Sequence, residues 1–493
     1  MAATSSRPHG DRLSALPDAT LARVLSHLPT GEAVRSSVLS RRWRSVHTTV
    51  PVVSLADSKR GGMGRIYSQP VCFEHQVTSA LICRDPAAPI RALRVDVLHP
   101  TWPLLDQWIV IALKSGAEEV DVAVRYHNSY SRHRLCPSAP LEDASADFDY
   151  QRIGRFVTTP RHIFRSVALR RLRLANWTLD LPSGDAPAFV SLETLALKKI
   201  MAPRGALQRL LSGCQRLTDL TLEQCPTATE ITVASAHLQS LTMVCCHKAT
   251  RVVLDTLCLR RLRYRGSLPP DTLFSIANHA SIAAVTVDIC EDIGGKTPSE
   301  VGTIAKLISQ CTNLTFLHLS LRPEMASCGY VFTDVLRGLT RLRQLELKGC
   351  LLDDYSVASA VALLQSTNNL EALSLFHVPP DPPNKMAYYY DSDSDSDRYP
   401  PKDDKDSGDG GNIFVPKSLW RTNVMCLKYK VKRIRLVGYR GHRFEGILAK
   451  FLLSKAQVLD EISVSMATTG RKDEMAKELA SWRCNGRTRV TCA

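Results

Sequence analysis

The sequence contains no long hydrophobic run: no stretch approaches twenty consecutive apolar residues, although 44% of the 493 residues are hydrophobic. A membrane-spanning helix needs about twenty such residues, so no membrane span is expected. The beginning of the chain also lacks the apolar core of a secretory signal. We therefore expect a globular protein of the cytoplasm, the nucleus or both, with a disordered tail over residues 1–10.

Cysteine is present but follows no framework, because the fifteen cysteines are odd in number and no CxxC pair occurs. Without a secretory signal, such a scattered set predicts reduced thiols rather than disulfides. The fourteen histidines form no cluster with the spacing of metal ligands. We expect no metal and no cofactor.

The common catalytic motifs are missing as well. Gly295-Lys296-Thr297 resembles the end of a P-loop, but Cys290 stands where the leading glycine belongs. HExxH and GxSxG do not occur. Neither the catalytic-cysteine context nor the paired metal ligands of a ubiquitin-transferring module are visible. These absences predict a protein that is not an enzyme.

Acidic residues are outnumbered, 48 against 63 Lys and Arg, which gives a net charge of +15. The basic residues are spread along the chain, with local clusters at 41–44, 170–173 and 260–265. The last two clusters alternate with apolar residues as strands do, so we interpret them as solvated strand faces. A basic surface for acidic partners is the alternative, and nucleic acid is a less favoured ligand.

A short three-helix pattern occupies residues 11–55. Its first helix is predicted to carry one apolar stripe at i, i+3, i+4 and i+7, formed by Leu21, Val24, Leu25 and Leu28. Pro29 ends this helix, while Thr30 and Ser40 are placed to cap a second and a third. So small a module buries too little surface for an independent core. We expect another protein to cover part of its apolar face.

These residues resemble the F-box of plant F-box proteins, with Leu16-Pro17-Asp18 at its start and Ser40-Arg41-Arg42-Trp43 near its end. The resemblance implies binding to a Skp-family adaptor, and through it to a cullin-RING ubiquitin ligase. The adaptor contacts that it implies are Leu16, Pro17, Leu21, Val24, Leu25, Leu28, Pro29, Val34, Val38, Leu39 and Trp43. Gly31 and His47 depart from the family pattern, in place of a basic and an aromatic residue, and would weaken the adaptor contact.

A repeat of the form apolar-x-x-apolar-x-apolar runs through the rest of the chain. Clear copies begin at Leu169, Leu192, Leu217, Leu238, Leu259, Ile282, Leu314, Leu342 and Leu370, and weaker ones at Ile90, Ala117, Val431 and Leu459. Successive clear copies are 23, 25, 21, 21, 23, 32, 28 and 28 residues apart. This spacing is typical of leucine-rich repeats, in which short parallel strands bury their leucines by stacking on neighbouring units. The fold class expected is α/β, a horseshoe solenoid with helices on its outer face.

Several smaller features fit the same repeat. Helices are predicted between the strands over 205–211, 299–309 and 356–366. Four cysteines fall three residues after the last apolar position of a copy, where this repeat class buries an Asn or Cys: Cys225, Cys246, Cys290 and Cys350.

The C-terminal region resembles the FBD-type segment of plant F-box/leucine-rich-repeat proteins, in the stretches 426–441 and 448–459. It predicts one more strand, an amphipathic helix and a final strand, followed by a capping helix over 475–482. A solenoid needs such a cap because its last repeat would otherwise expose its core to water.

An acidic, proline- and serine-rich stretch interrupts the repeats at residues 379–416, and its composition predicts disorder. Asp391, Asp393 and Asp395 imitate the start of a calcium loop, but Ser396 and Lys402 replace the required Gly and Glu, so calcium binding is not expected. The serines among the acids are candidate phosphorylation sites. A second hypothesis is that this stretch masks the basic solenoid.

The resulting domain scheme is a tail (1–10), an F-box (11–55), a linker and solenoid entry (56–88), repeats (89–378), the acidic insert (379–416) and the last repeats with the FBD-like segment and cap (417–493). Because alternate strand residues point away from the core, the candidate target-binding residues are Lys198, Thr221, Glu223, Thr242, Arg263, Arg265, Thr286, His318, Glu346, Lys348, Phe376 and Arg435.

The favoured function is therefore that of a substrate-recognition subunit of an SCF-type ligase, which binds a protein target for ubiquitination and degradation. A scaffold that works without the adaptor is the first alternative, and a basic solenoid that binds nucleic acid is the second.

Overall fold

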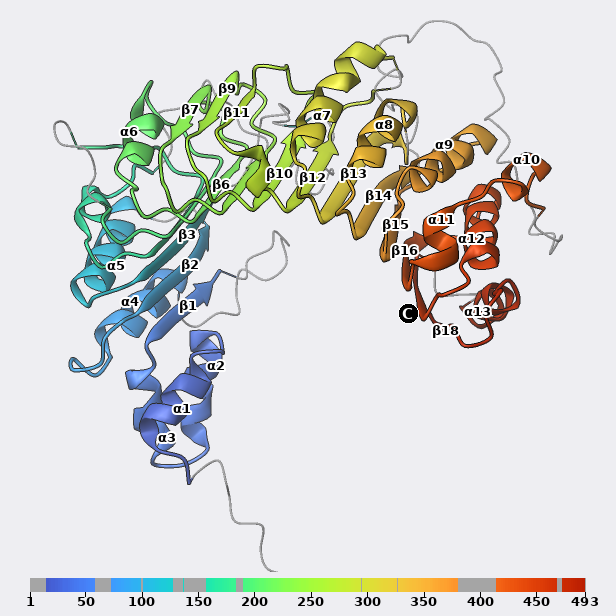
Figure 1. Ribbon diagram of the computed structural model, residues 1–493. Helices are drawn as coiled ribbons and strands as arrows, with labels where there is room; N and C mark the ends of the chain where they lie inside the picture. The colour runs from blue at the N-terminus through green and yellow to red at the C-terminus, as the bar shows by residue number, and fades with distance from the viewer. Residues whose placement is uncertain are drawn as a thin grey trace, which may run out of the picture. The chain divides into compact units, whose positions relative to one another are not determined.

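The structure, a computed structural model, describes residues 15–57, 72–98, 101–126, 136, 157–182, 189–293, 295–325, 327–379, 414–467 and 472–492. It confirms the predicted α/β class, with parallel strands and helices that follow a helical N-terminal module (Figure 1). The predicted tail and nearly all of the acidic insert lie outside the described residues. The described part contains no helix that is long and apolar enough to cross a bilayer. Two units are distinguished, residues 1–258 with 272–277 and residues 259–271 with 278–493.

The N-terminal module has three short helices, α1 (Asp18–Leu25), α2 (Thr30–Arg35) and α3 (Trp43–Val46), with 3₁₀ turns at Ser36–Val38 and His47–Thr49. The predicted Thr30 cap is wrong, because α2 begins at Thr30 itself and no side chain caps it. The Thr30 hydroxyl instead accepts a hydrogen bond from Ser54 N at 2.7 Å. Ser40 Oγ accepts only a long bond, 3.5 Å, from Trp43 N.

The first unit contains seven parallel strands in the order β1-β2-β3-β4-β5-β6-β8. Their bounds are Val52–Ala56, Ala92–Leu98, Glu119–Arg125, Arg171–Ala175, Thr194–Lys198, Asp219–Glu223 and Ser240–Val244. The register aligns the middle apolar residue of one copy with that of the next, as in Leu172 with Leu195 and Leu220 with Leu241. Helices α4 (Phe73–Ile82), α5 (Trp102–Lys114) and α6 (Ala206–Ser212) belong to this unit, and η5 is a 3₁₀ turn at Arg161–Arg165.

The second unit continues the same pattern with β10, β12, β13, β14, β15, β16, β17 and β18 in that order. Their bounds are Arg261–Gly266, Ala284–Ile289, Phe316–Glu324, Gln344–Cys350, Ala372–His377, Arg433–Tyr439, Glu461–Met466 and Arg489–Cys492. Leu317, Leu345 and Leu373 align across three strands and are buried. Burial of one such side chain contributes about 1.5–3 kcal/mol, so the stacked rows are the main source of stability.

The segment that returns from one strand to the next depends on the repeat length. The longer repeats of the second unit return through α7 (Pro298–Gln310), α8 (Tyr330–Gly338) and α9 (Asp354–Gln365), which stand in a row beside β12–β15 (Figure 1). Repeats 21–23 residues apart have no room for a helix. They return instead through β7 (Glu230–Val233), β9 (Arg251–Leu254) and β11 (Phe274–Ile276), which form a second parallel sheet in the first unit. That second sheet was not predicted.

A left-handed residue ends several strands of the first unit: Asn176, Lys199, Gln224 and Cys245 have φ between 51° and 63°. The reversal turns the next side chain into the core. Cys225 and Cys246 occupy this inward position, and their thiols donate to the carbonyls of Leu197 (3.3 Å) and Leu222 (3.6 Å) in the preceding strand. All four cysteines assigned to this position are buried, as predicted.

The C-terminal region contains the predicted strand, helix and strand as β16, α12 (Arg443–Lys455) and β17. Two short helices precede them, α10 (Lys417–Trp420) and α11 (Met425–Tyr429). The predicted cap is α13 (Lys472–Ser481), which starts earlier than expected. It is followed by β18, a strand that was not predicted, which pairs in parallel with β17.

Candidate functional site

The predicted adaptor contacts separate into a buried and an exposed group. Leu21, Leu25 and Trp43 are buried in the core of the F-box module, and Leu16 packs against it half-buried. This core is completed by Ala22, Ala33, Val46 and Val50. The single stripe predicted on α1 is therefore divided, because only two of its four residues face this core.

The remaining predicted contacts face solvent. They are Pro17, Val24, Leu28, Pro29, Val34, Val38 and Leu39. Val38 is 84% exposed and Leu39 64% exposed, just after α2. So many large apolar side chains on a module of this size form a surface typical of a protein–protein contact.

A polar contact that the sequence did not single out fixes the start of α1. Arg42 donates to Asp18 Oδ1 at 2.7 Å and also to the carbonyl of Leu16. Its guanidinium thereby ties the segment before α3 to the Leu16-Pro17-Asp18 segment. Its basic neighbours in the sequence hid this role, because charge alone does not show which arginine has a carboxylate partner.

The two departures from the F-box pattern differ in their consequences. Gly31 is exposed, and a Cβ added there would meet no atom within 4 Å. A larger residue therefore fits without rearrangement, and Gly31 removes a contact only by lacking a side chain. His47 is half-buried, and its Nδ1 is buried without a hydrogen bond among the described residues.

The candidate target-binding residues of the first unit occupy outward positions. Lys198 is exposed, and Thr221, Glu223 and Thr242 are half-buried. Lys198 Nζ lies 2.8 Å from Glu223 Oε1 on the adjacent strand, and Thr221 is aligned with Thr242. This face is polar and largely paired within itself.

In the second unit the candidates fall into two outward rows that cross the strands. The first row contains Arg263, Thr286, His318, Glu346 and Arg435, and the second contains Arg265, Lys348 and Phe376. None of the eight is fully buried. The alternation rule therefore placed all of them on the intended face of the strands.

A denser cluster lies where these rows cross β12–β15. Asp288 Oδ2 is 3.3 Å from Lys348 Nζ and 3.8 Å from Arg265 Nε, and His318 Nδ1 is 3.0 Å from Glu346 Oε2. The rings of His318 and Phe376 are 5.8 Å apart. The cluster thus combines a carboxylate between two cations with an adjacent aromatic pair.

Two polar residues of this cluster were missed, Asp288 and Ser320. Asp288 Oδ1 and Ser320 Oγ are buried and make no hydrogen bond within the described part of the chain. Buried polar atoms are nearly always paired, so these two are available to a donor from a bound molecule. Extending the alternation by two residues beyond Thr286 and His318 would have found both.

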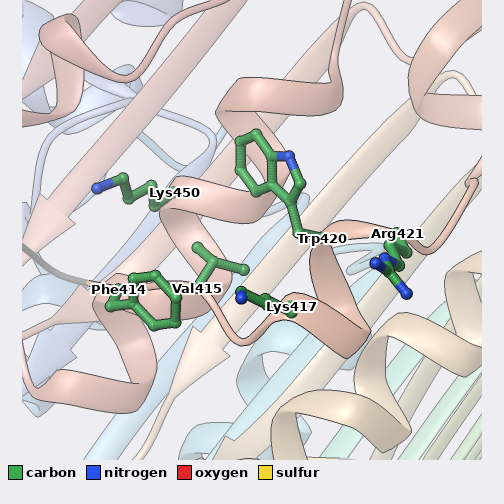
Figure 2. Close-up of a pocket in the computed structure, with 6 residues that line it drawn as sticks. All are labelled: Phe414, Val415, Lys417, Trp420, Arg421 and Lys450. Carbon is green, nitrogen blue, oxygen red and sulfur yellow. The ribbon is translucent and has the colours of Figure 1, made fainter.

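A separate pocket of about 430 Å³ follows the acidic insert in the sequence. It is lined by Phe414, Val415, Lys417, Trp420, Arg421 and Lys450. Figure 2 shows Val415 between the rings of Phe414 and Trp420. Lys455, on the same helix as Lys450, places its Nζ 5.1 Å from the Trp420 ring centre. The combination of cations and exposed aromatic rings suits an acidic peptide that also carries an apolar side chain.

Comparison with protein families identifies two regions of the chain. The F-box domain family matches residues 13–48. The family described as the LRR repeats of the FBD-associated F-box protein At5g56370 matches residues 146–283. Both matches lie within the regions to which the sequence assigned these modules.

Relatives in Arabidopsis thaliana extend the likeness. The F-box/FBD/LRR-repeat protein At4g26340 is 25% identical over 481 residues, 96% of this chain and 97% of that protein. The FBD-associated F-box protein At5g60610 is 23% identical, covering 92% of this chain and all of that protein. The putative F-box/LRR-repeat protein At5g41840 is 29% identical, but the match spans only 43% of this chain and 37% of that protein.

The names of these relatives describe F-box and repeat proteins and mention no catalytic activity, which agrees with an adaptor-type role. An F-box implies, in general, binding to a Skp-family adaptor. The chain is an F-box protein with FBD-associated leucine-rich repeats, similar over nearly its whole length to plant F-box/FBD/LRR-repeat proteins.

Proposed function

We propose that this chain is the non-catalytic substrate-recognition subunit of an SCF-type ubiquitin ligase, acting in the cytoplasm, the nucleus or both. Its F-box binds a Skp-family adaptor and so joins a cullin-RING complex. The outward strand residues hold a target protein for ubiquitination and proteasomal degradation. The observation that carries the proposal is the solvent-exposed apolar surface of the F-box module, centred on Val38 and Leu39.

Energetics support an apolar partner for that surface. Transfer of a Val or Leu side chain from water into an interface contributes on the order of 1.5–3 kcal/mol. Val24, Leu28, Val34, Val38 and Leu39 are all more than 40% exposed. Since the module's own core is formed by other residues, covering these five does not require the module to unfold.

Co-purification with a Skp-family adaptor tests the first half of the proposal. The full chain should retain the adaptor, whereas Val38→Asp with Leu39→Asp should lose it, because two charges would be buried in the contact. Val167→Asp is the matched control, since Val167 is 66% exposed in the same unit but outside the F-box. Absence of the adaptor from the wild-type chain, or its retention by the double variant, contradicts the proposal.

The target-binding half rests on the cluster around Asp288 and Ser320. Their unpaired buried oxygens accept hydrogen bonds, and Lys348, Phe376 and Arg435 supply charge and an apolar ring on the same face. A partner segment with backbone N–H donors and acidic side chains matches this chemistry.

Target capture by the Val38→Asp/Leu39→Asp chain tests this half, because bound targets should not be degraded. Adding Phe376→Asp and Arg435→Glu should remove the proteins that accumulate in wild-type cells only when the proteasome is inhibited. Tyr355→Asp, exposed on α9, is the control and should leave capture unchanged. Capture that is equal in both variants would move the target site elsewhere.

A further inference from the structure

The first unit brings together three side chains that are far apart in the sequence. The sulfur atoms of Cys136 and Cys245 and a ring nitrogen of His247 all lie within 4.8 Å of one another. Both cysteines are buried. Sequence spacing could not show this group, because Cys136 precedes Cys245 by more than one hundred residues.

The repeat architecture does not account for these residues. The buried position that the repeats reserve for cysteine is held by Cys225 and Cys246, whose thiols bond to the preceding strand. Cys245 occupies the left-handed position before it, which Lys199 and Gln224 fill in the neighbouring repeats. The turn therefore requires no cysteine at position 245, and Cys136 lies in no repeat strand at all.

We propose that Cys136, Cys245 and His247 bind a zinc ion. Two thiolates and an imidazole form a donor set that zinc prefers, and calcium or magnesium would require oxygen ligands. Zn–S bonds are about 2.3 Å and Zn–N bonds about 2.0–2.1 Å, so donors around a tetrahedral ion are roughly 3.4–3.8 Å apart. Donors already within 4.8 Å reach that geometry by small side-chain movements. The fourth position is left to water or to one further side chain.

The ion has a structural role in this proposal. Binding deprotonates the two thiols and fastens Cys136, which lies between β3 and β4 in the sequence, to the end of β8. The site would thus add a cross-link to the first unit in a compartment where disulfides do not persist.

Metal analysis of the full chain, purified without chelators and in complex with its adaptor if required for solubility, tests the proposal. We expect about one zinc per chain. Cys136→Ser, Cys245→Ser and His247→Asn should each lose most of it. Cys258→Ser, an exposed cysteine in the same unit, should keep it. Replacement of zinc by cobalt should produce thiolate-to-metal charge-transfer absorption that the serine variants weaken.

Cys136→His separates metal binding from folding, because it exchanges one zinc ligand for another while removing the cysteine. Retained zinc in Cys136→His together with its loss in Cys136→Ser supports the site. The proposal is overturned if the full chain holds no zinc after incubation with a zinc salt and desalting. It is also overturned by equal zinc in all variants, or by a Cys136–Cys245 disulfide in mass spectra of the unreduced chain.

Discussion

Among single residues, exposure separates F-box positions that their sequence pattern groups together. Leu21 and Leu25 are buried, whereas Val24 and Leu28 on the same predicted stripe are more than 40% exposed. Helical periodicity predicts an apolar arc around α1. It does not predict which part of that arc the module covers itself, because that depends on where the Trp43 ring packs.

This division predicts opposite effects for two adjacent residues. Leu25→Ala should destabilise the F-box module by about 2–5 kcal/mol, because it leaves a cavity in the core. Val24→Ala should leave the unfolding midpoint nearly unchanged and weaken adaptor binding. Thermal denaturation and adaptor titration of both variants check this. A large fall in melting temperature for Val24→Ala would show that the exposed group belongs to the core.

A buried histidine of the second unit gives a prediction for pH dependence. His377 Nδ1 lies 3.7 Å from Glu445 Oε1, and neither of its ring nitrogens makes a hydrogen bond within the described residues. Burial lowers the pKa of His377 from its ordinary value, with Glu445 opposing that shift and Arg440 adding to it. The carboxylate of Glu445 accepts from the backbone N–H groups of Arg440 and Gly441.

The unfolded chain therefore binds a proton at His377 at a higher pH than the folded chain does. The free energy of unfolding should fall as the pH drops below about 6.5, until the folded-state pKa is reached. Melting temperatures measured between pH 7 and pH 5 should decline less for His377→Phe than for the wild type. His237→Phe, at an exposed position, should follow the wild type. Identical declines for wild type and His377→Phe would assign the pH dependence to other groups.

Among the elements, apolar spacing predicted almost every strand, because each repeat strand must present its leucines to its neighbours in register. The second sheet escaped prediction for a physical reason. A strand such as β7 has only two buried side chains, Ile231 and Val233, too few for a periodic pattern to stand out. Strand β18 escaped because Val490 and Cys492 are only half-buried.

Two glycines in neighbouring elements test how tightly the strands pack. A Cβ at Gly349 in β14 would lie 2.5 Å from the backbone of Met325, whereas one at Gly302 in α7 would meet nothing within 4 Å. Gly349→Ala should cost roughly 1–3 kcal/mol of stability, because backbone must move. Gly302→Ala should stabilise by about 0.5–1 kcal/mol. Chemical denaturation measures both, and a neutral Gly349→Ala would indicate a looser approach of the strands.

For the molecule as a whole, the net charge of +15 overstates how basic its strand faces are. In the first unit, Arg94 and Arg171 lie within 3.5 Å of Glu119, and Arg173 lies 3.6 Å from Asp121. Cross-strand carboxylates thus partner much of the cluster at 170–173. This supports its interpretation as a solvated face, which composition alone could not decide because partners come from other repeats.

The pairing leads to a prediction about nucleic acid. The full chain should show no saturable binding to a labelled DNA duplex at low salt in fluorescence anisotropy. Glu119→Gln with Asp121→Asn should create weak binding that decreases steeply with salt, because it removes the carboxylate partners of three arginines. Tight, salt-sensitive binding by the wild-type chain would instead favour a nucleic-acid ligand.

The hydrogen bond between Thr30 and Ser54 has a consequence for ubiquitin transfer. Since α2 is fastened to the first solenoid strand, the F-box and β1 turn together rather than swinging on a free linker. In a ligase that works by placement, such a stiff joint narrows the arc that a held target sweeps before the conjugating enzyme. The choice of which target lysines are modified would then be set partly by this hinge and not only by what the repeats recognise.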